Sequence, residues 1–273
     1  MPDNLHRPLR QSDLLPSGPL RRLGTRLLLF SEVDSTNAYL LSQAGGLPDG
    51  VIACAELQLQ GRGRLGRRWL APRGSSVLCS TLLIEPPQSV WTDLLPLLAG
   101  LAAAEAIEQV TGVGAVVRWP NDLVFQGRKL GGVLIESAPL EFHPHTGGPA
   151  RALAIGIGLN VLQQHGHFPA ALADKATSLE IESSHPVDRA TVARTLIERL
   201  DHRLVEAQIA DSEDLRAAWL ARCQDLGARV RLLHDGLEFE GTIIDLDQHG
   251  DLVVQLDQGG VRCFRGAATS RAW

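Results

Sequence analysis

The order of hydrophobic and polar positions in the first two thirds of the chain predicts a domain that mixes strands and helices. Short apolar runs typical of strands occupy residues 27–30, 51–55, 76–84, 115–119, 123–125, 129–136 and 152–161. Helical patterns begin after Asp34, at the potential cap Thr92 and at the potential cap Asp188. They extend to residues 45, 110 and about 210, and a further helix is predicted over residues 213–223. We therefore predict an α/β (α+β) fold with a mixed sheet.

After Gly227 the pattern changes to strands only. Apolar runs at residues 229–233, 237–246, 252–256 and 261–264 are separated by turn signals such as Asp235-Gly236 and Gly259-Gly260. Such a series predicts a small β-barrel module. We expect an N-terminal extension over residues 1–24, a main domain over 25–224 and the β-module over 225–273.

Composition agrees with an ordinary globular protein. The 273 residues are 44% hydrophobic and 21% charged, and neither a membrane-spanning run nor a signal-peptide core is evident. The four cysteines, Cys54, Cys79, Cys223 and Cys263, are far apart and form no C-x-x-C pair. This usage favours reduced thiols in the cytoplasm over a disulfide framework or a zinc site.

One loop stands out in a chain whose formal net charge is −5. Residues 58–69 read Q-L-Q-G-R-G-R-L-G-R-R-W, with four arginines among three glycines. Guanidinium groups on a pliable backbone suit a phosphate or a carboxylate, and the terminal Trp69 offers a face on which a base can stack. We refer to residues 58–69 as the arginine loop. Charge alone would also allow a merely solvated loop.

Lysine is scarce. Of the 26 basic residues only Lys129 and Lys175 are lysines, so arginine is the default cation of this sequence. A lysine that is retained is expected where a compact ammonium is needed, and Lys129 lies beside the glycine pair of K-L-G-G.

Three further polar groups flank predicted strands. S-T-N at residues 35–37 fits a helix N-cap as well as a ligand site, and W-P-N-D at 119–122 fits a surface turn as well as a Mg²⁺ carboxylate. Glycines in the strands K-L-G-G at 129–132 and G-I-G-L-N at 156–160 indicate that a ligand lies close to the backbone.

Taken in order, these motifs resemble the biotin–protein ligase family, from about residue 28 to the C-terminus. The resemblance implies an α/β catalytic domain followed by an SH3-like barrel. It also implies two half-reactions, in which biotin and ATP give biotinyl-5′-AMP and an acceptor lysine of a biotin carboxyl carrier domain then attacks that anhydride. Biotin and ATP would be substrates and Mg²⁺ the metal.

The resemblance also assigns roles. Catalytic roles fall to Lys129, Arg62 and Arg64, and Mg²⁺ placement to Asp122. The biotin site would comprise Ser35, Thr36, Asn37, Gln58, Gly61, Arg62, Gly63, Arg64, Lys129, Gly132 and Gly158. The ATP site would comprise Arg64, Arg67, Trp69, Asn121, Lys129 and Asn160. Arg118 stands where the family usually has lysine, and we interpret it as an equivalent cation.

Two rival functions are open to the sequence, and several partners are not expected. A lipoate or octanoate ligase of related fold is the nearest rival, although the polar S-T-N and Gln58 set favours a ureido head group. A nucleic-acid-binding module is disfavoured by the negative charge and the few aromatics. We expect no membrane partner, no DNA-binding domain within residues 1–24, and either a monomer or a homodimer. His143 and His145 are expected to be loop residues rather than metal ligands.

Overall fold

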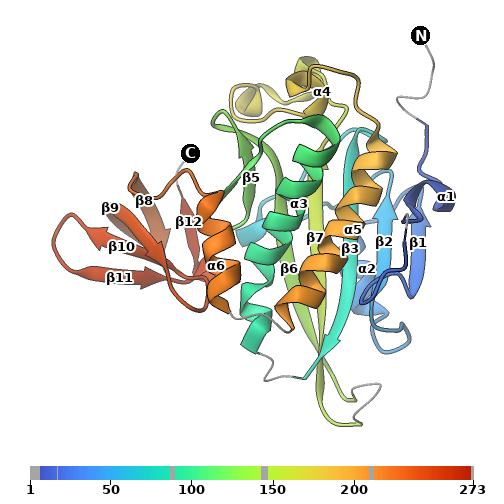
Figure 1. Ribbon diagram of the computed structural model, residues 1–273, viewed down its shortest axis with the longest axis horizontal. Coiled ribbons are helices and arrows are strands. Elements are labelled where there is room, and N and C mark those ends of the chain that lie inside the picture. Colours follow the sequence, from blue (N-terminus) through green and yellow to red (C-terminus); the bar gives the residue numbers. More distant parts are fainter. Residues whose placement is uncertain (1–6, 17, 87–89, 143–146, 209–211, 272–273) are drawn as a thin grey trace.

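The computed structural model describes residues 7–16, 18–86, 90–142, 147–208 and 212–271. His143 and His145 lie outside the described residues. The main domain is built on a seven-stranded sheet with the order β1-β2-β3-β7-β6-β5-β4 (Figure 1). Its strands are β1 (Arg26–Phe30), β2 (Val51–Ala55), β3 (Ser76–Glu85), β4 (Val116–Arg118), β5 (Asp122–Phe125), β6 (Arg128–Leu140) and β7 (Ala150–Asn160). Only β1 and β2 pair in parallel, so the sheet is mixed, as predicted.

Helices cover both faces of this sheet, and strand alternation assigns side chains to each. Helices α3 (Leu95–Thr111) and α5 (Arg189–Ala207) pack together on one face, over residues such as Ile155, Ile157 and Leu159 of β7. Helix α2 (Thr36–Ser42) lies on the other face, where Leu40 packs against residues of β2 and β3. Because α2 is short, it leaves part of its face uncovered, and Gly132 of β6 and Gly156 and Gly158 of β7 lie there.

Helix ends follow the sequence signals with two exceptions. Helix α2 ends at Ser42 rather than at the predicted residue 45, because residues 43–46 form a turn in which the Gly46 amide donates to the Gln43 carbonyl. Asp188 caps α5 by accepting from the amides of Ala190 and Thr191, and Gly112 ends α3 with a φ of 70°. The prediction that Thr92 caps α3 is wrong, because Thr92 lies in a preceding 3₁₀ turn and accepts instead from Arg151. Helix α3 begins at Leu95 because a proline is best accommodated in the first helical turn, where its missing amide is not needed.

The N-terminal segment packs on the main domain. It contains the short helix α1 (Gln11–Leu14), whose Leu14 is buried. The carboxylate of Asp201, on α5, accepts from the backbone amides of residues 21, 22 and 23 at 2.7–2.9 Å. A second anchor is the buried pair of Glu56 and Arg189, which also bonds to the backbone of residues 7 and 9. These contacts fasten residues 7, 9 and 21–23 to α5 and to Glu56, which follows β2.

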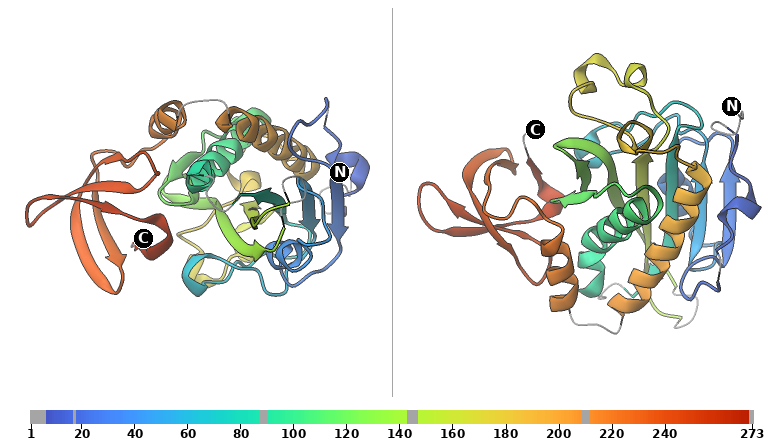
Figure 2. Two further views of the ribbon diagram at one scale, coloured as in Figure 1. Left: turned by 90° about the horizontal axis from the view of Figure 1, so that it is seen from below. Right: turned by 45° about the horizontal axis from the view of Figure 1, so that its top comes forward.

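The C-terminal strands form a second, antiparallel sheet with the order β11-β10-β9-β8-β12. Its strands are β8 (Arg229–His234), β9 (Leu237–Leu246), β10 (Leu252–Leu256), β11 (Val261–Phe264) and β12 (Thr269–Arg271), of which β12 was not predicted. This small β-module lies at the β4 end of the main sheet, joined to it through α6 (Ser212–Ala221) (Figures 1 and 2). The indole of Trp119 fixes the contact by donating to the carbonyl of Gly250 at 3.0 Å. The domain boundaries given above stay a prediction.

One helical stretch among the described residues, Trp91–Thr111, is apolar and long enough to span a bilayer by length and composition alone. Its most apolar window is 72% buried between the sheet and α5. This burial is what a central core helix requires, and the stretch gives no support for a membrane partner.

Candidate active site

A cavity of about 760 Å³ opens on the face of the main sheet that α2 leaves uncovered. Its lining is strongly basic. Among the described residues around it, Asp122 is the single acidic side chain, whereas eight are lysine or arginine: Arg62, Arg64, Arg67, Arg68, Arg118, Lys129, Lys175 and Arg271. In a chain with a net charge of −5, this concentration of positive charge indicates an anionic ligand.

Glycines form the floor of the cavity. A Cβ atom on Gly156 would lie 2.6 Å from Asn37 Oδ1, and one on Gly158 would lie 2.8 Å from the Trp69 ring. On the neighbouring strand β6, a Cβ on Gly132 would lie 3.3 Å from Lys129 Nζ. The glycines therefore let three polar or aromatic side chains of the protein approach the sheet. That a ligand also lies on these strands stays a prediction.

One end of the cavity is a buried hydrogen-bonded network at the start of α2. Thr36 Oγ1 lies 2.6 Å from Ser80 Oγ, and Ser80 in turn donates to Asn37 Oδ1 at 2.7 Å. Gln58 Oε1 accepts from the amide and the hydroxyl of Thr36, at 2.8 and 3.0 Å. Ser35 is the N-cap of α2 and also lines the cavity. This end can bind a small head group with both donors and acceptors.

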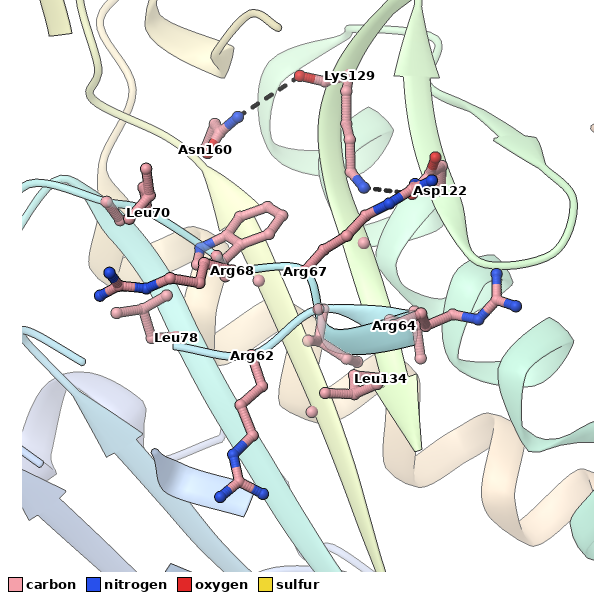
Figure 3. Close-up of a pocket in the computed structure, with 18 of the residues that line it drawn as sticks. Arg62, Arg64, Arg67, Arg68, Leu70, Leu78, Asp122, Lys129, Leu134 and Asn160 are labelled. Carbon is pink, nitrogen blue, oxygen red and sulfur yellow. Dashed lines mark hydrogen bonds and ion pairs between the residues drawn. The ribbon is translucent and has the colours of Figure 1, made fainter. Parts of the chain in front are cut away.

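The arginine loop is a folded hairpin. The Trp69 amide donates to the Gly61 carbonyl at 2.9 Å, and the Gly63 amide donates to the Arg67 carbonyl at 2.7 Å. A Cβ on Gly61 would lie 2.5 Å from the Trp69 carbonyl, which explains the requirement for glycine at this position. The four arginines radiate from the hairpin, and Arg67 extends towards Lys129 and Asp122 (Figure 3).

Three loop arginines, Arg62, Arg64 and Arg68, donate to protein groups. Arg68 donates to the nearby carbonyl of Leu59 at 3.1 Å. Arg62 Nη1 donates to Glu136 Oε1 at 3.0 Å, and the other oxygen of Glu136 accepts from Asn37 Nδ2 at 3.0 Å. Glu136 thus connects the arginine loop to the polar end of the cavity.

Arg64 connects the arginine loop to the β-module. It donates to Asn121 Oδ1 at 3.1 Å, to the Thr269 carbonyl at 2.7 Å and to the Gly266 carbonyl. Burial lowers the pKa of the Arg64 guanidinium; the nearby positive charge of Arg67 acts in the same direction, and the Asp122 carboxylate opposes it. The β-module therefore contributes directly to the conformation of the loop.

A cation lies opposite the loop. The Lys129 ammonium donates to Asp122 Oδ1 across the β5–β6 hairpin and lies 5.8 Å from the centre of the Trp69 ring (Figure 3). A turn at Gln126 and Gly127, both with positive φ, makes this hairpin and brings the two side chains together. The backbone of Lys129 is itself fixed by hydrogen bonds to residues 175 and 177.

The structure brings every residue expected from the sequence to one place. All of them except Gly61 line the cavity, and Gly61 pairs with Trp69 within the arginine loop. Arg118 also lines it, with Nε 3.7 Å from Asp225 Oδ2. Sequence reasoning missed Ser80, Glu136 and Gln163, which occur singly within strands or loops and carry no local motif.

Comparisons with known proteins agree with this geometry. Residues 29–160 match the model of the biotin/lipoate A/B protein ligase family. The chain is 34% identical over 243 residues to the biotin–[acetyl-CoA-carboxylase] ligase of Mycobacterium tuberculosis, covering 86% of this chain and 84% of that protein. It is 31% identical over 251 residues to the bifunctional ligase/repressor BirA of Escherichia coli, covering 90% of this chain and 74% of that protein.

A solved structure shares the fold. The biotin protein ligase of Aquifex aeolicus in complex with biotin and ATP superposes with a TM-score of 0.74 at 28% identity, covering 91% of this chain and 99% of that chain. The fold, the cavity and the relatives give one answer: the chain belongs to the biotin–protein ligase family.

Proposed function

We propose that the protein is an ATP-dependent biotin–protein ligase that forms biotinyl-5′-AMP and then transfers biotin to a lysine of a biotin carboxyl carrier domain. The observation that carries the proposal is the arrangement of the cavity. A buried polar network at one end is followed along the glycine floor by the arginine loop and Lys129, and then by the Trp69 ring. The biotin head group would occupy the polar end of the cavity. The biotin carboxylate and the α-phosphate of ATP would lie at the arginine loop and Lys129, and the nucleoside would lie at the Trp69 ring.

The polar end favours biotin over an acyl chain. Asn37, Ser80 and Gln58 are committed to a network that offers directional donors and acceptors, as a ureido ring requires. A lipoyl or octanoyl chain could not use these donors and acceptors, whereas a ureido ring can bond to them. The family model covers both kinds of ligase, so the lipoate or octanoate ligase is the second candidate.

The basic lining supplies what the activation step needs. When a carboxylate oxygen attacks the α-phosphorus of ATP, two anions approach and pyrophosphate leaves. Arg62, Arg64 and Lys129 would hold the carboxylate and the α-phosphate, and Arg67 would bind the remaining phosphates. Arg62 and Arg64 would have to exchange their present partners, Glu136 and the β-module, for the ligand. Fixed cations in a site that excludes water lower the barrier, typically by about 3 kcal/mol for each donor.

Transfer would follow the same geometry. A neutral lysine amine of the carrier attacks the carbonyl of the mixed anhydride, AMP leaves with the bonding electrons, and the amine loses a proton. The cations that stabilised the phosphate then stabilise AMP as the leaving group, so no nucleophile of the ligase is required.

Asp122 fits a magnesium ion. Mg²⁺ is usually bound by one or two carboxylates together with phosphate oxygens and water, so a single carboxylate beside the phosphate region is sufficient. When bound there, the ion would neutralise phosphate charge.

The test is labelling of a purified carrier domain. The protein is incubated with ATP, Mg²⁺ and one acid (biotin, lipoate or octanoate), and the carrier is analysed by intact mass and peptide mapping. Addition of one biotinoyl group to one lysine, with biotin alone, supports the proposal. Labelling of a lipoyl domain with lipoate or octanoate instead would favour the second candidate.

A further inference from the structure

A buried amide next to the predicted adenine site is left unexplained by the roles above. Gln163 follows β7 by three residues, is 1% exposed and lines the cavity together with Asn160 and Trp69. Its Oε1 atom is buried and has no hydrogen-bond partner. A buried acceptor without a partner costs about 1–3 kcal/mol, so a site that retains one is expected to satisfy it when a ligand binds.

The orientation of this amide is fixed by its neighbours. Asn160 Nδ2 donates to the carbonyl of Thr177 at 3.0 Å, which directs Asn160 Oδ1 towards Gln163. Gln163 Nε2 donates to that oxygen at 3.1 Å and to Ser76 Oγ at 2.6 Å. Reversing the Gln163 amide would bring its oxygen against Asn160 Oδ1, which can only accept, so Oε1 is the atom that stays available.

We propose that Gln163 is a specificity residue of the nucleotide site, whose Oε1 accepts a hydrogen bond from the exocyclic amino group of adenine. The proposal rests on the proposed function, because it takes Trp69 and Asn160 as the adenine site. Both hydrogens of the Gln163 amide are used within the protein, so the group offers the nucleotide only an acceptor. Adenine presents an amino donor at this edge, whereas guanine presents a carbonyl oxygen there, and two acceptors would face each other.

The experiment compares ATP with purine riboside triphosphate, which lacks only the amino group. Biotin-dependent pyrophosphate exchange gives kcat/KM for each nucleotide with the wild type, Gln163→Met and Gln163→Leu. We expect the wild type to prefer ATP roughly tenfold, as one hydrogen bond allows, and both variants to lose most of that preference. The exposed neighbour provides the control, since Gln164→Met should keep the wild-type ratio.

A double-mutant cycle separates direct reading from positioning of Asn160. If Gln163 contacts the amino group, Gln163→Met still lowers the ATP-to-analogue ratio in an Asn160→Ala background. An unchanged ratio in that background would show that Gln163 acts only through Asn160 and would overturn the proposal. Equal losses with both nucleotides in the single variants would overturn it as well. Absence of biotin-dependent exchange in the wild type would instead refute the proposed function.

Discussion

Lys129 donates to Asp122 across the β5–β6 hairpin, and this ion pair lies directly opposite the arginine loop. Lys129 is one of two lysines in the sequence, and Asp122 is the single carboxylate found in the described lining of the cavity. Together they place a compact positive charge where we expect the α-phosphate, with a metal-binding oxygen beside it.

Substitution of Gly156 and of Gly158, on the floor of the cavity, should affect the binding of different substrates. In Gly156→Ala the new methyl group would lie 2.6 Å from Asn37 Oδ1, so Asn37 has to move and the polar end is disturbed. In Gly158→Ala it would lie 2.8 Å from the Trp69 ring. We expect KM for biotin to rise by about tenfold or more in the first variant and KM for ATP to do so in the second. The opposite pattern, measured by steady-state pyrophosphate exchange, would contradict the assignment of the two ends.

Glu136→Gln should release Arg62 without disturbing Asn37. Glutamine keeps an acceptor for Asn37 Nδ2 but loses the charge that pairs with Arg62. Arg62 is half exposed, so loss of the pair should change stability by less than about 1 kcal/mol. In this variant the Arg62 guanidinium no longer has to leave Glu136 before it binds the biotin carboxylate, so we expect KM for biotin to fall severalfold.

The control for this prediction is Glu136→Ala, which removes both contacts and should raise KM for biotin. Isothermal titration with biotin gives the same comparison without catalysis. A weaker affinity in Glu136→Gln would show that the carboxylate supports binding rather than competing for Arg62.

Docking of the β-module should depend on Trp119. Replacing the buried Trp119 by phenylalanine removes the 3.0 Å hydrogen bond to Gly250 and leaves a small void. We expect a loss of about 1–3 kcal/mol, seen as a melting temperature lower by roughly 2–4 °C for each kcal/mol. An unchanged melting temperature would mean that the contact is not important for stability.

The exposed Cys263 should be the thiol most accessible to modification. Partial desolvation of this thiol raises its pKa, and so do the carboxylates of Asp247 and Asp251, which repel the thiolate. Its reaction with an aromatic disulfide should therefore accelerate as pH rises through that pKa.

Cys54 and Cys79 are buried opposite each other on β2 and β3. The contact with Cys79, together with burial, raises the pKa of Cys54 well above its ordinary value. We expect both to react only after unfolding, which thiol counting with and without denaturant would measure. Rapid reaction of either in the native protein would contradict the buried placement.

Local patterns were sufficient to predict the sheet, the arginine loop and the glycine floor, because strand alternation, turns and motifs are properties of neighbouring residues. They did not predict the contacts that fix the loop. Glu136 is 74 residues from Arg62, and the carbonyls of Gly266 and Thr269 are more than 200 residues from Arg64. Nor did they predict that residues 7–23 pack on α5, since one buried carboxylate, Asp201, provides the amide contacts. Such interactions depend on the folded topology.

The most direct measurement is biotin-dependent ATP–pyrophosphate exchange by the wild type, Lys129→Ala and Lys129→Arg. We predict robust exchange with biotin, a loss of about 10²-fold or more in kcat for the alanine variant, and little rescue by arginine, because the ammonium fits between Gly132 and Asp122. Exchange that persists at the wild-type rate in Lys129→Ala, or that needs lipoate or octanoate in place of biotin, would contradict the account.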